Sequence, residues 1–335
     1  MKNIIKISFV FLIAILFSCG NNNTTTTVKT DSVKYQKLTT PDFNADSAYL
    51  YVKNQVDFGP RVPGTAQHDS CAKYFAKFFK NLKAEVIVQE TKVKVFDGKY
   101  VPCKNIIAQY SPEKISRVAL FSHWDSRPYA DHDPDEKNHK KPILGANDGG
   151  SSTGVLMEIA RQLSISQPHV GIDIILFDVE DYGQPEWYTQ KQVEDSWCLG
   201  SQYWAKNPHK TGYFAQYGIL LDMVGGKDAV FTREGTSMYY APNVVDKVWN
   251  TGIRIGYSSY FSFDRTNNLI DDHLYVNKLI NIPSIDIIHH DATSATRFHK
   301  AWHTVGDDMS VIDKNTLKAV GQTVLEVIFN EIPLQ

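Results

Sequence analysis

Short apolar segments that end on acidic residues or on histidine limit what this sequence can fold into more than any other feature. The segments that read as strands are 84–95, 105–109, 118–122, 172–178, 218–222 and 284–288. Several of them are apolar at successive positions, and strands of that kind are buried on both faces of a sheet. The sequence therefore predicts a central sheet that is covered by helices on both sides.

Segments with helical periodicity alternate with these strands. Apolar residues recur at helical spacing in residues 45–58, 66–82, 152–163, 196–206, 243–255 and 315–329. This alternation predicts an α/β fold, a three-layer sandwich around a mixed, largely parallel sheet. In such sheets the ligand crevice lies beyond the carboxyl ends of the strands, where the polar residues described below are found.

Residues 1–18 have the composition of an export signal. Lys2 and Lys6 lead into an apolar run at 7–17, which is too short to span a bilayer, and a small residue precedes Cys19. The ending Leu-Phe-Ser-Cys resembles a bacterial lipoprotein signal, which implies cleavage before Cys19 and lipidation of that residue. An ordinary signal peptide with a coincidental cysteine is the alternative. Either signal exports the protein, to the periplasm or the cell surface.

The remaining chain reads as a tether followed by one domain. Residues 19–42 are expected to be a flexible tether, because their first part is rich in Asn and Thr and has little apolar surface to bury. Residues 43–335 contain no linker-like segment, and their length suits a single domain.

Charge and cysteine content restrict the partners. The 35 Lys and Arg residues nearly balance the 37 Asp and Glu residues, giving a net charge of -2, so nucleic acid is not indicated and a membrane would be reached only through the lipid anchor. Apart from Cys19, the cysteines are Cys71, Cys103 and Cys198, at spacings unlike a zinc–thiolate site. They allow one disulfide in an oxidising compartment, but the sequence does not select the pair.

Histidine and acidic residues follow the predicted strands in several places. His123 and Asp125 end one strand and, being two residues apart, point to the same side of the chain, as metal ligands or the residues behind them would. Asp148 lies in a glycine-rich loop before a helix. Glu180 and Asp181 follow the most apolar strand, and adjacent acids there repel one another unless a cation or a proton intervenes.

Three more clusters occur later in the chain. They are Asp222 at the end of an apolar strand, Asp271-Asp272-His273, and Trp302-His303-Thr304. Each cluster alone has an ordinary structural explanation, since Asp and Gly close many strand-to-helix loops. Zinc accepts imidazole and carboxylate ligands together, and catalytic zinc sites use three protein ligands and an open position. Taken together, the clusters indicate a metal site.

The order of these motifs resembles the zinc-dependent exopeptidase fold of the aminopeptidase family. The motifs are His-x-Asp at 123–125, Asp-Gly-Gly at 148–150, Glu-Asp at 180–181, Leu-Asp at 221–222 and Trp-His-Thr at 302–304. Within that family the chain is most similar to the glutaminyl-peptide cyclotransferases of the animal type, which also occur in bacteria. The similarity extends from Asp57 to the final predicted helix.

The resemblance implies a metal-binding set and a proton carrier. Asp148, Asp181 and His303 would bind one zinc ion per chain, and Glu180 would act as general acid and base. Relatives usually have Glu-Glu where this chain has Glu180-Asp181, so the denticity of the shorter ligand stays open.

The resemblance also implies the walls and the floor of a pocket. Asp222 and Asp272 would form a polar catalytic floor, and Trp187 and Trp302 match positions that line the cyclase pocket. Ordinary core packing is the alternative for both tryptophans, and it is weaker for Trp302, which adjoins the proposed ligand His303.

The implied reaction converts the N-terminal glutamine of peptides or proteins to pyroglutamate and releases ammonia. The α-amine must reach the carbonyl carbon of its own side chain, which requires a pocket that holds that side chain folded. Zinc would polarise the carbonyl, and Glu180 would carry a proton from the amine to the departing ammonia. The chain is expected to act as a monomer.

A two-metal aminopeptidase is the main alternative. The ligands for two metals would be His123, Asp148, Asp222, Asp181 and His303, with Asp148 bridging and Glu180 as the base for a water molecule. Trp187, Trp302 and the Asp-Asp-His cluster favour the cyclase. An exported binding lipoprotein on an inactive scaffold is a third interpretation, but it predicts the loss of an acid, and none is missing.

Two irregular segments are expected near the site. Residues 127–142 are polar and lie between the first two clusters, so they are expected to form a lid or a rim, as a solvated charged loop rather than a second metal site. Residues 257–268, which are rich in Tyr, Ser and Phe, are expected to border the pocket as a specificity wall.

Overall fold

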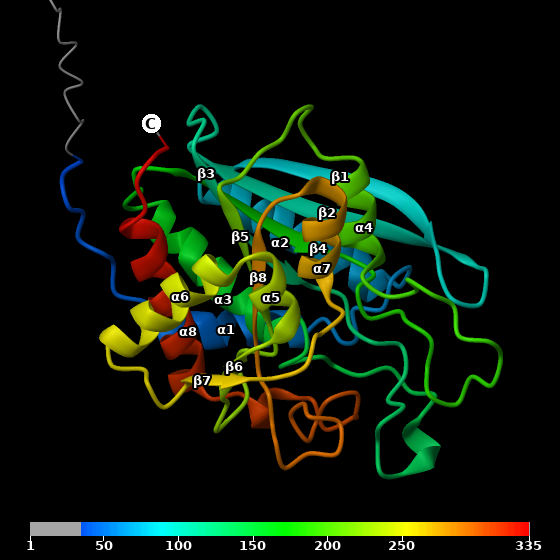
Figure 1. Ribbon diagram of the computed structural model, residues 1–335. Coiled ribbons are helices and arrows are strands. Elements are labelled where there is room, and N and C mark those ends of the chain that lie inside the picture. The colour runs from blue at the N-terminus through cyan, green and yellow to red at the C-terminus, as the bar shows by residue number, and fades with distance from the viewer. Residues whose placement is uncertain (1–34, 335) are drawn as a thin grey trace, which may run out of the picture. The chain divides into compact units, whose positions relative to one another are not determined.

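A mixed sheet forms the centre of the structure, a computed structural model that describes residues 35–334 (Figure 1). Its strands are β1 (Glu85–Lys94), β2 (Tyr100–Tyr110), β3 (Arg117–His123), β4 (Gly171–Phe177), β5 (Tyr217–Asp222) and β8 (Ser284–Ile288). They lie in the order β1-β2-β4-β3-β5-β8. Neighbours among β4, β3, β5 and β8 pair in parallel, whereas β2 pairs antiparallel with both β1 and β4.

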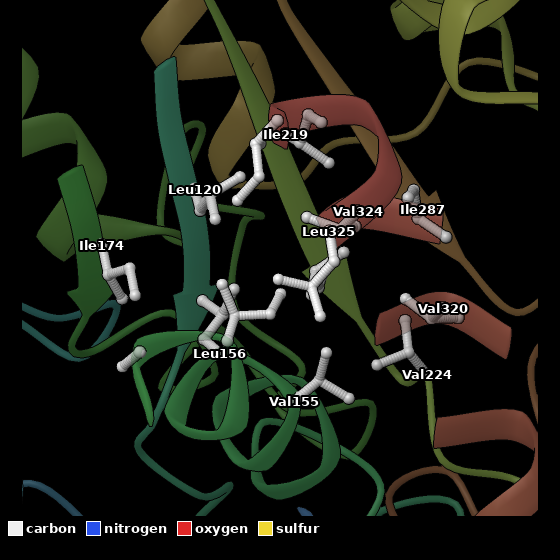
Figure 2. Close-up of a cluster of buried hydrophobic side chains, with 14 of the residues drawn as sticks. Leu120, Val155, Leu156, Ile174, Ile219, Val224, Ile287, Val320, Val324 and Leu325 are labelled. Carbon is white, nitrogen blue, oxygen red and sulfur yellow. The ribbon is translucent and has the colours of Figure 1, made fainter. Parts of the chain in front are cut away.

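Alternate residues of the buried strands enter two cores on opposite faces of the sheet. In β3, Leu120 packs into the larger core and Phe121 into the smaller one, because successive side chains of a strand point to opposite faces. Figure 2 shows Leu120 and Ile219 together with Leu156 of α3 (Gly150–Leu163) in the larger core. The apolar runs in the sequence follow from burial on both faces.

Helices cover both faces of the sheet, as Figure 1 shows. The larger core includes residues of α3 and of α1 (Ala45–Val56), α2 (Ala66–Asn81), α6 (Pro242–Arg254) and α8 (Lys314–Phe329). The smaller core includes residues of α4 (Leu199–Lys206) and α7 (Asp272–Ile280). Helix, sheet and helix make three layers, which confirms the predicted α/β fold class.

Four elements of the described chain were not predicted, besides two 3-10 turns. They are α7, α5 (Gly235–Tyr240), β6 (Phe231–Arg233) and β7 (Phe261–Arg265). Strands β6 and β7 and helix α5 are too short to show a periodic pattern. Strand β2 begins at Tyr100 instead of residue 105, because its first residues pair with β1 across a hairpin.

The predicted signal at 1–18, Cys19 and most of the predicted tether lie outside the described residues. The last part of the tether segment contacts the domain: the carbonyl oxygens of Pro41 and Asp42 accept hydrogen bonds from Gln322 and Gln162. From Gln36 onward the described chain forms one compact unit. Within residues 35–334, no helix has both the length and the apolar character that crossing a membrane requires.

Candidate metal site and substrate pocket

The polar residues singled out in the sequence meet at the carboxyl edge of the parallel strands. His123 is the last residue of β3, and Asp222 is the last residue of β5. Glu180 and Asp181 follow β4, and Asp148 precedes α3. Because β3, β4 and β5 run parallel, their carboxyl ends share one edge of the sheet, where segments far apart in the sequence converge.

One group of possible metal donors consists of Asp148, Asp181 and His303. Nε2 of His303 lies 3.1 Å from Oδ1 of Asp181 and 3.7 Å from Oδ2 of Asp148. All three side chains are buried. Tetrahedral ligands bound about 2.0–2.1 Å from a zinc ion lie roughly 3.3 Å from one another. The structure therefore brings the three predicted ligands within the spacing that one ion requires.

Asp148 also belongs to a second group, with His123 and Asp222. Nε2 of His123 lies 3.0 Å from Oδ1 of Asp148 and 3.2 Å from Oδ1 of Asp222. Burial lowers the pKa of His123, but its contacts with Asp125, Asp148 and Asp222 outweigh burial and raise that pKa well above its usual value. Asp148 thus stands between two imidazoles, and donors for a second ion are also present.

The first group has the features of a cation site. Among residues 35–334, neither Oδ2 of Asp148 nor Oδ2 of Asp181 finds a hydrogen-bond partner, although both atoms are buried. Burial and the charge of Asp148 raise the pKa of Asp181, as expected for carboxyl groups packed together. A cation between them would satisfy both oxygens and remove the repulsion. Zinc suits this set, because it binds imidazole and carboxylate together.

Asp125 supports the donors from behind. Its carboxylate accepts hydrogen bonds from the backbone N–H of Glu180 at 3.1 Å and of Asp181 at 3.2 Å. It also lies 3.6 Å from Nδ1 of His123. These contacts hold the turn after β4, where Val179 has a φ of 54°, an unusual conformation for a β-branched residue. One carboxylate thus holds the backbone of Glu180 and of the possible metal donor Asp181, and lies close to the imidazole of His123.

A buried ion pair orients His303. Arg127 donates through Nε and Nη2 to the two oxygens of Asp131, at 2.7 and 2.6 Å. Oδ1 of Asp131 lies 3.4 Å from Nδ1 of His303. Burial would raise the pKa of Asp131, but Arg127 and His303 outweigh it and hold that pKa far below its usual range. A carboxylate behind a metal-binding imidazole is common in zinc sites.

This ion pair corrects the prediction of a solvated charged loop for the first part of residues 127–142, whereas residues 134–142 are exposed or half-buried, as predicted. Arg127, Asp131 and Asp133 are buried, and a 3-10 helix spans Glu136–Asn138. The carboxylate of Asp133 accepts a hydrogen bond from the backbone N–H of Val305, two residues after His303. The charges of Arg127, Asp131 and Asp133 therefore have partners inside the protein, which the composition of the segment does not reveal.

Asp307 and Gly149 fix the loop that carries Asp148. The carboxylate of Asp307 accepts hydrogen bonds from the backbone N–H of Asn147 at 2.8 Å and of Asp148 at 3.0 Å. Gly149 has a φ of 79°, and a Cβ atom there would lie 2.8 Å from Cε1 of His123. Only glycine leaves room for the imidazole beside this loop.

Glu180 lies beside the donors and faces other acids. Burial, together with the charges of Asp181, Asp271 and Asp272, raises the pKa of Glu180 well above its usual range. Asp271 lines the pocket and caps α7, whereas Asp272 is fully buried as the first residue of that helix. Asp222 also lines the pocket, and burial raises its pKa to about 7. The structure therefore adds Asp271 to the predicted floor and places Asp272 behind it.

A cavity of ≈ 220 Å³ adjoins the donors. Besides the acids and His303, it is lined by Gln192, Trp197, Met223, Leu269, Ile270, Ile288, Phe298 and Trp302. The ring of Trp302 stacks on that of His303, with the centroids 3.6 Å apart. The volume of the cavity lies below the roughly 300–1,000 Å³ of sites for drug-sized ligands, so the cavity suits a single amino-acid residue.

Trp197, and not Trp187, is the second tryptophan of this cavity. Trp187 is 38% exposed and packs against Tyr129. Trp197 lies parallel to His303, with the ring centroids 6.0 Å apart. The sequence pattern placed Trp197 in a helix that was expected from residue 196, but α4 begins only at Leu199, so the ring belongs to the preceding loop.

Sequence reasoning also missed the residues that hold the donors in place. The sequence gives one hint of Asp131 and Asp307, namely that both are acidic. A metal ligand usually needs a further residue to orient it, and that residue is often an acid.

The predicted specificity wall, residues 257–268, does not line the cavity. Leu269 and Ile270, which follow directly, do line it.

The comparisons with known proteins agree with this geometry. Residues 105–328 match the peptidase family M28. A solved glutaminyl cyclase of Bacteroides thetaiotaomicron, bound to N-acetylhistamine, is 55% identical over 88% of this chain and 100% of that chain, with a TM-score of 0.86. A solved Zn-dependent exopeptidase from Parabacteroides distasonis is 54% identical over the same shares, also with a TM-score of 0.86.

A more distant relative comes from an animal. The glutaminyl-peptide cyclotransferase of Drosophila melanogaster is 24% identical over 292 residues, which cover 80% of this chain and 76% of the relative. The similarity to cyclases inferred from the motifs is thereby confirmed. Since the family match covers more than half of the sequence, this chain belongs to peptidase family M28.

Proposed function

We propose that this chain is a zinc-dependent glutaminyl-peptide cyclotransferase. In the reaction, the α-amine nitrogen of an N-terminal glutamine bonds to the carbonyl carbon of its own side chain, the bond from that carbon to the side-chain nitrogen breaks, and ammonia leaves. The observation that carries the proposal is a cavity of ≈ 220 Å³ that Glu180, Asp181, His303 and Trp302 line together. The 55% identity to a solved bacterial glutaminyl cyclase supports it.

The metal would be held by Asp148, Asp181 and His303. Zinc bound there supplies a Lewis acid that polarises the side-chain carbonyl of the substrate. Arg127 and Asp131 hold His303, and Asp125 holds the turn of Asp181. The donors are therefore fixed before the substrate arrives, and their reorganisation does not add to the barrier.

Glu180 would carry the proton. It accepts a proton from the α-ammonium group and returns one to the departing ammonia. A carboxyl group suits both steps when its pKa approaches the working pH. Burial and the nearby acids raise the pKa of Glu180 in that direction. Asp271, whose carboxylate lies within 4.8 Å of that of Glu180 on the cavity wall, would bind the ammonium group before it loses its proton.

The aromatic walls would fold the substrate. Glutamine reacts with itself only when its side chain curls back on its amine, and holding that conformation removes entropy before the reaction. Trp197, Phe298 and Trp302 line the small cavity, and a folded glutamine side chain packed between them would leave little room for water. Water in that space would compete with the amine for the activated carbonyl, so exclusion favours cyclisation over hydrolysis.

We further propose that one zinc ion binds per chain. His123 would then bind the other oxygen of Asp148 and the carboxylate of Asp222, and its Nε2 lies 3.0 Å from Oδ1 of Asp148 and 3.2 Å from Oδ1 of Asp222. All proposed catalytic groups come from one chain, so a monomer is sufficient.

A two-metal aminopeptidase remains the second candidate, because a specific observation favours it. His123, Asp148 and Asp222 lie as close together as the first group of donors, and Asp148 is shared. Two metals bridged by one carboxylate would activate water for attack on the first peptide bond, with Glu180 as the base. The similar solved structures include one named a leucine aminopeptidase precursor and one named a glutaminyl cyclase.

The two candidates release different products, which one assay separates. We expect the zinc-loaded protein to release ammonia from a peptide with N-terminal glutamine and to release no arylamine from leucine anilide. A peptide with N-terminal asparagine is the matched control, because its shorter side chain would have to close a strained four-membered ring. Arylamine without ammonia would refute the cyclase and favour the peptidase.

Replacing Glu180 by Gln should abolish most of the turnover while zinc stays bound. The amide keeps the size of the side chain but cannot exchange a proton, so kcat should fall by about 10²- to 10⁴-fold. Zinc content, measured by elemental analysis, should stay at the wild-type level. Glu113→Gln, in the exposed turn between β2 and β3, is the control. A variant that retains wild-type kcat would remove Glu180 from the mechanism.

We also propose that the chain is exported and anchored through a lipid on Cys19, on the strength of the signal-like residues 1–18. Cells grown with a labelled fatty acid should then yield a labelled, membrane-associated protein, and Cys19→Ser should lose the label. Equal labelling of the wild type and the variant would contradict the anchor, and a soluble, unlabelled wild type would favour an ordinary signal peptide.

A further inference from the structure

A buried thiol touches the proposed proton carrier. Sγ of Cys198 lies 3.2 Å from Oε1 of Glu180, within the distance of a hydrogen bond from sulfur, and Cys198 is fully buried. Cys71, Cys103 and Cys198 are free thiols, so Cys198 has no disulfide partner among the described residues. The sequence offered no reason to link this cysteine to the site.

The backbone fixes both sides of this contact. The N–H of Cys198 donates to the carbonyl oxygen of Glu180, and the N–H of Leu199 donates to that of Val179, each at 3.0 Å. Cys198 has φ 56° and ψ 37° at the start of α4, a left-handed conformation that residues other than glycine seldom adopt. A chain held in this conformation at a packed site is typical of functional positions.

The surroundings make the thiol a donor. Burial and the charges of Glu180, Asp272 and Asp271 raise the pKa of Cys198 well above its usual value, so the sulfur keeps its proton. The S–H group can then donate to Glu180, whereas a thiolate would repel it. Cys198, Glu180 and Asp271 also lie close enough to share a cation, so a test of the thiol must count metal as well.

The neighbouring residue holds the other half of the site. Trp197 lies parallel to His303, and the guanidinium carbon of Arg127 lies 4.6 Å from the centroid of the Trp197 ring. Two successive residues therefore contact a proposed zinc ligand and the proposed proton carrier. The segment before α4 therefore contacts both His303 and Glu180 and helps to set the distance between them.

We propose that Cys198 is a positioning residue, whose thiol holds one carboxyl oxygen of Glu180 and leaves the other oxygen for the substrate. This inference rests on the proposed function, because it assigns Glu180 the proton transfer. A thiol is a weak donor, so it orients the carboxyl group without binding it as strongly as a hydroxyl or an amide would.

The test compares Cys198→Ala with Cys198→Ser. The first variant removes the donor, and the second keeps one. We expect kcat for the glutaminyl peptide to fall roughly three- to tenfold in Cys198→Ala with KM unchanged. Cys198→Ser should recover most of the loss. Cys71→Ala, which removes a buried thiol from α2, should match the wild type.

Each outcome decides the point. Wild-type kcat in Cys198→Ala, or an equal loss in Cys198→Ser, would overturn the positioning role, because a structural role depends on volume and not on a donor. A lowered zinc content in Cys198→Ala would show the sulfur to be a metal ligand and would also overturn it. If either variant melts below the assay temperature, kcat is measured at a lower temperature where zinc content equals that of the wild type.

The proposed function fails separately. A wild type that releases arylamine and no ammonia is a peptidase, whatever the variants do. In that case kcat of Cys198→Ala and Cys198→Ser is measured with leucine anilide, and a loss in the first variant with recovery in the second still supports the positioning role.

Discussion

Two imidazoles on either side of one carboxylate form the contact on which the rest of the site depends. His123 approaches Oδ1 of Asp148 at 3.0 Å, and His303 approaches Oδ2 at 3.7 Å. Around this centre the sheet edge gathers further acids, and burial raises the pKa of Asp181 and of Asp222. Positive charge is needed to hold such a cluster ionised. His123, His303 and Arg127 supply part of this charge, and we propose that a cation at Asp148 supplies the rest.

The donors are positioned by residues from distant parts of the chain. Asp131 stands behind His303, Asp125 holds the turn of Asp181, and Asp307 holds the loop of Asp148. The buried guanidinium of Arg61 adds to this support by donating to the carbonyl oxygens of Trp124, Leu144 and Gly145. Groups locked in this way keep their geometry without the ligand, which is what a site for charge stabilisation requires.

The sequence predicts the sheet and the donors for the same physical reason. Strands buried on both faces are mostly apolar, so polar residues at strand ends, such as His123 and Asp222, mark buried positions where chemistry can take place. The supporting residues carry no such mark. In the sequence Asp131 looks like part of a solvated charged run. Its buried ion pair with Arg127 depends on tertiary contacts, which the sequence does not show. Trp197 was missed because the long loop between β4 and α4 has no period that fixes where its rings point.

One measurement tests the central claim, that Asp148, Asp181 and His303 share a single zinc ion. Crystals of the zinc-loaded protein should show one anomalous peak at the zinc absorption edge, about 2.0–2.1 Å from Nε2 of His303 and within bonding distance of both aspartates. A second peak of equal height between His123 and Asp222 would contradict the single-metal account. The absence of a peak at His303 would contradict the site itself.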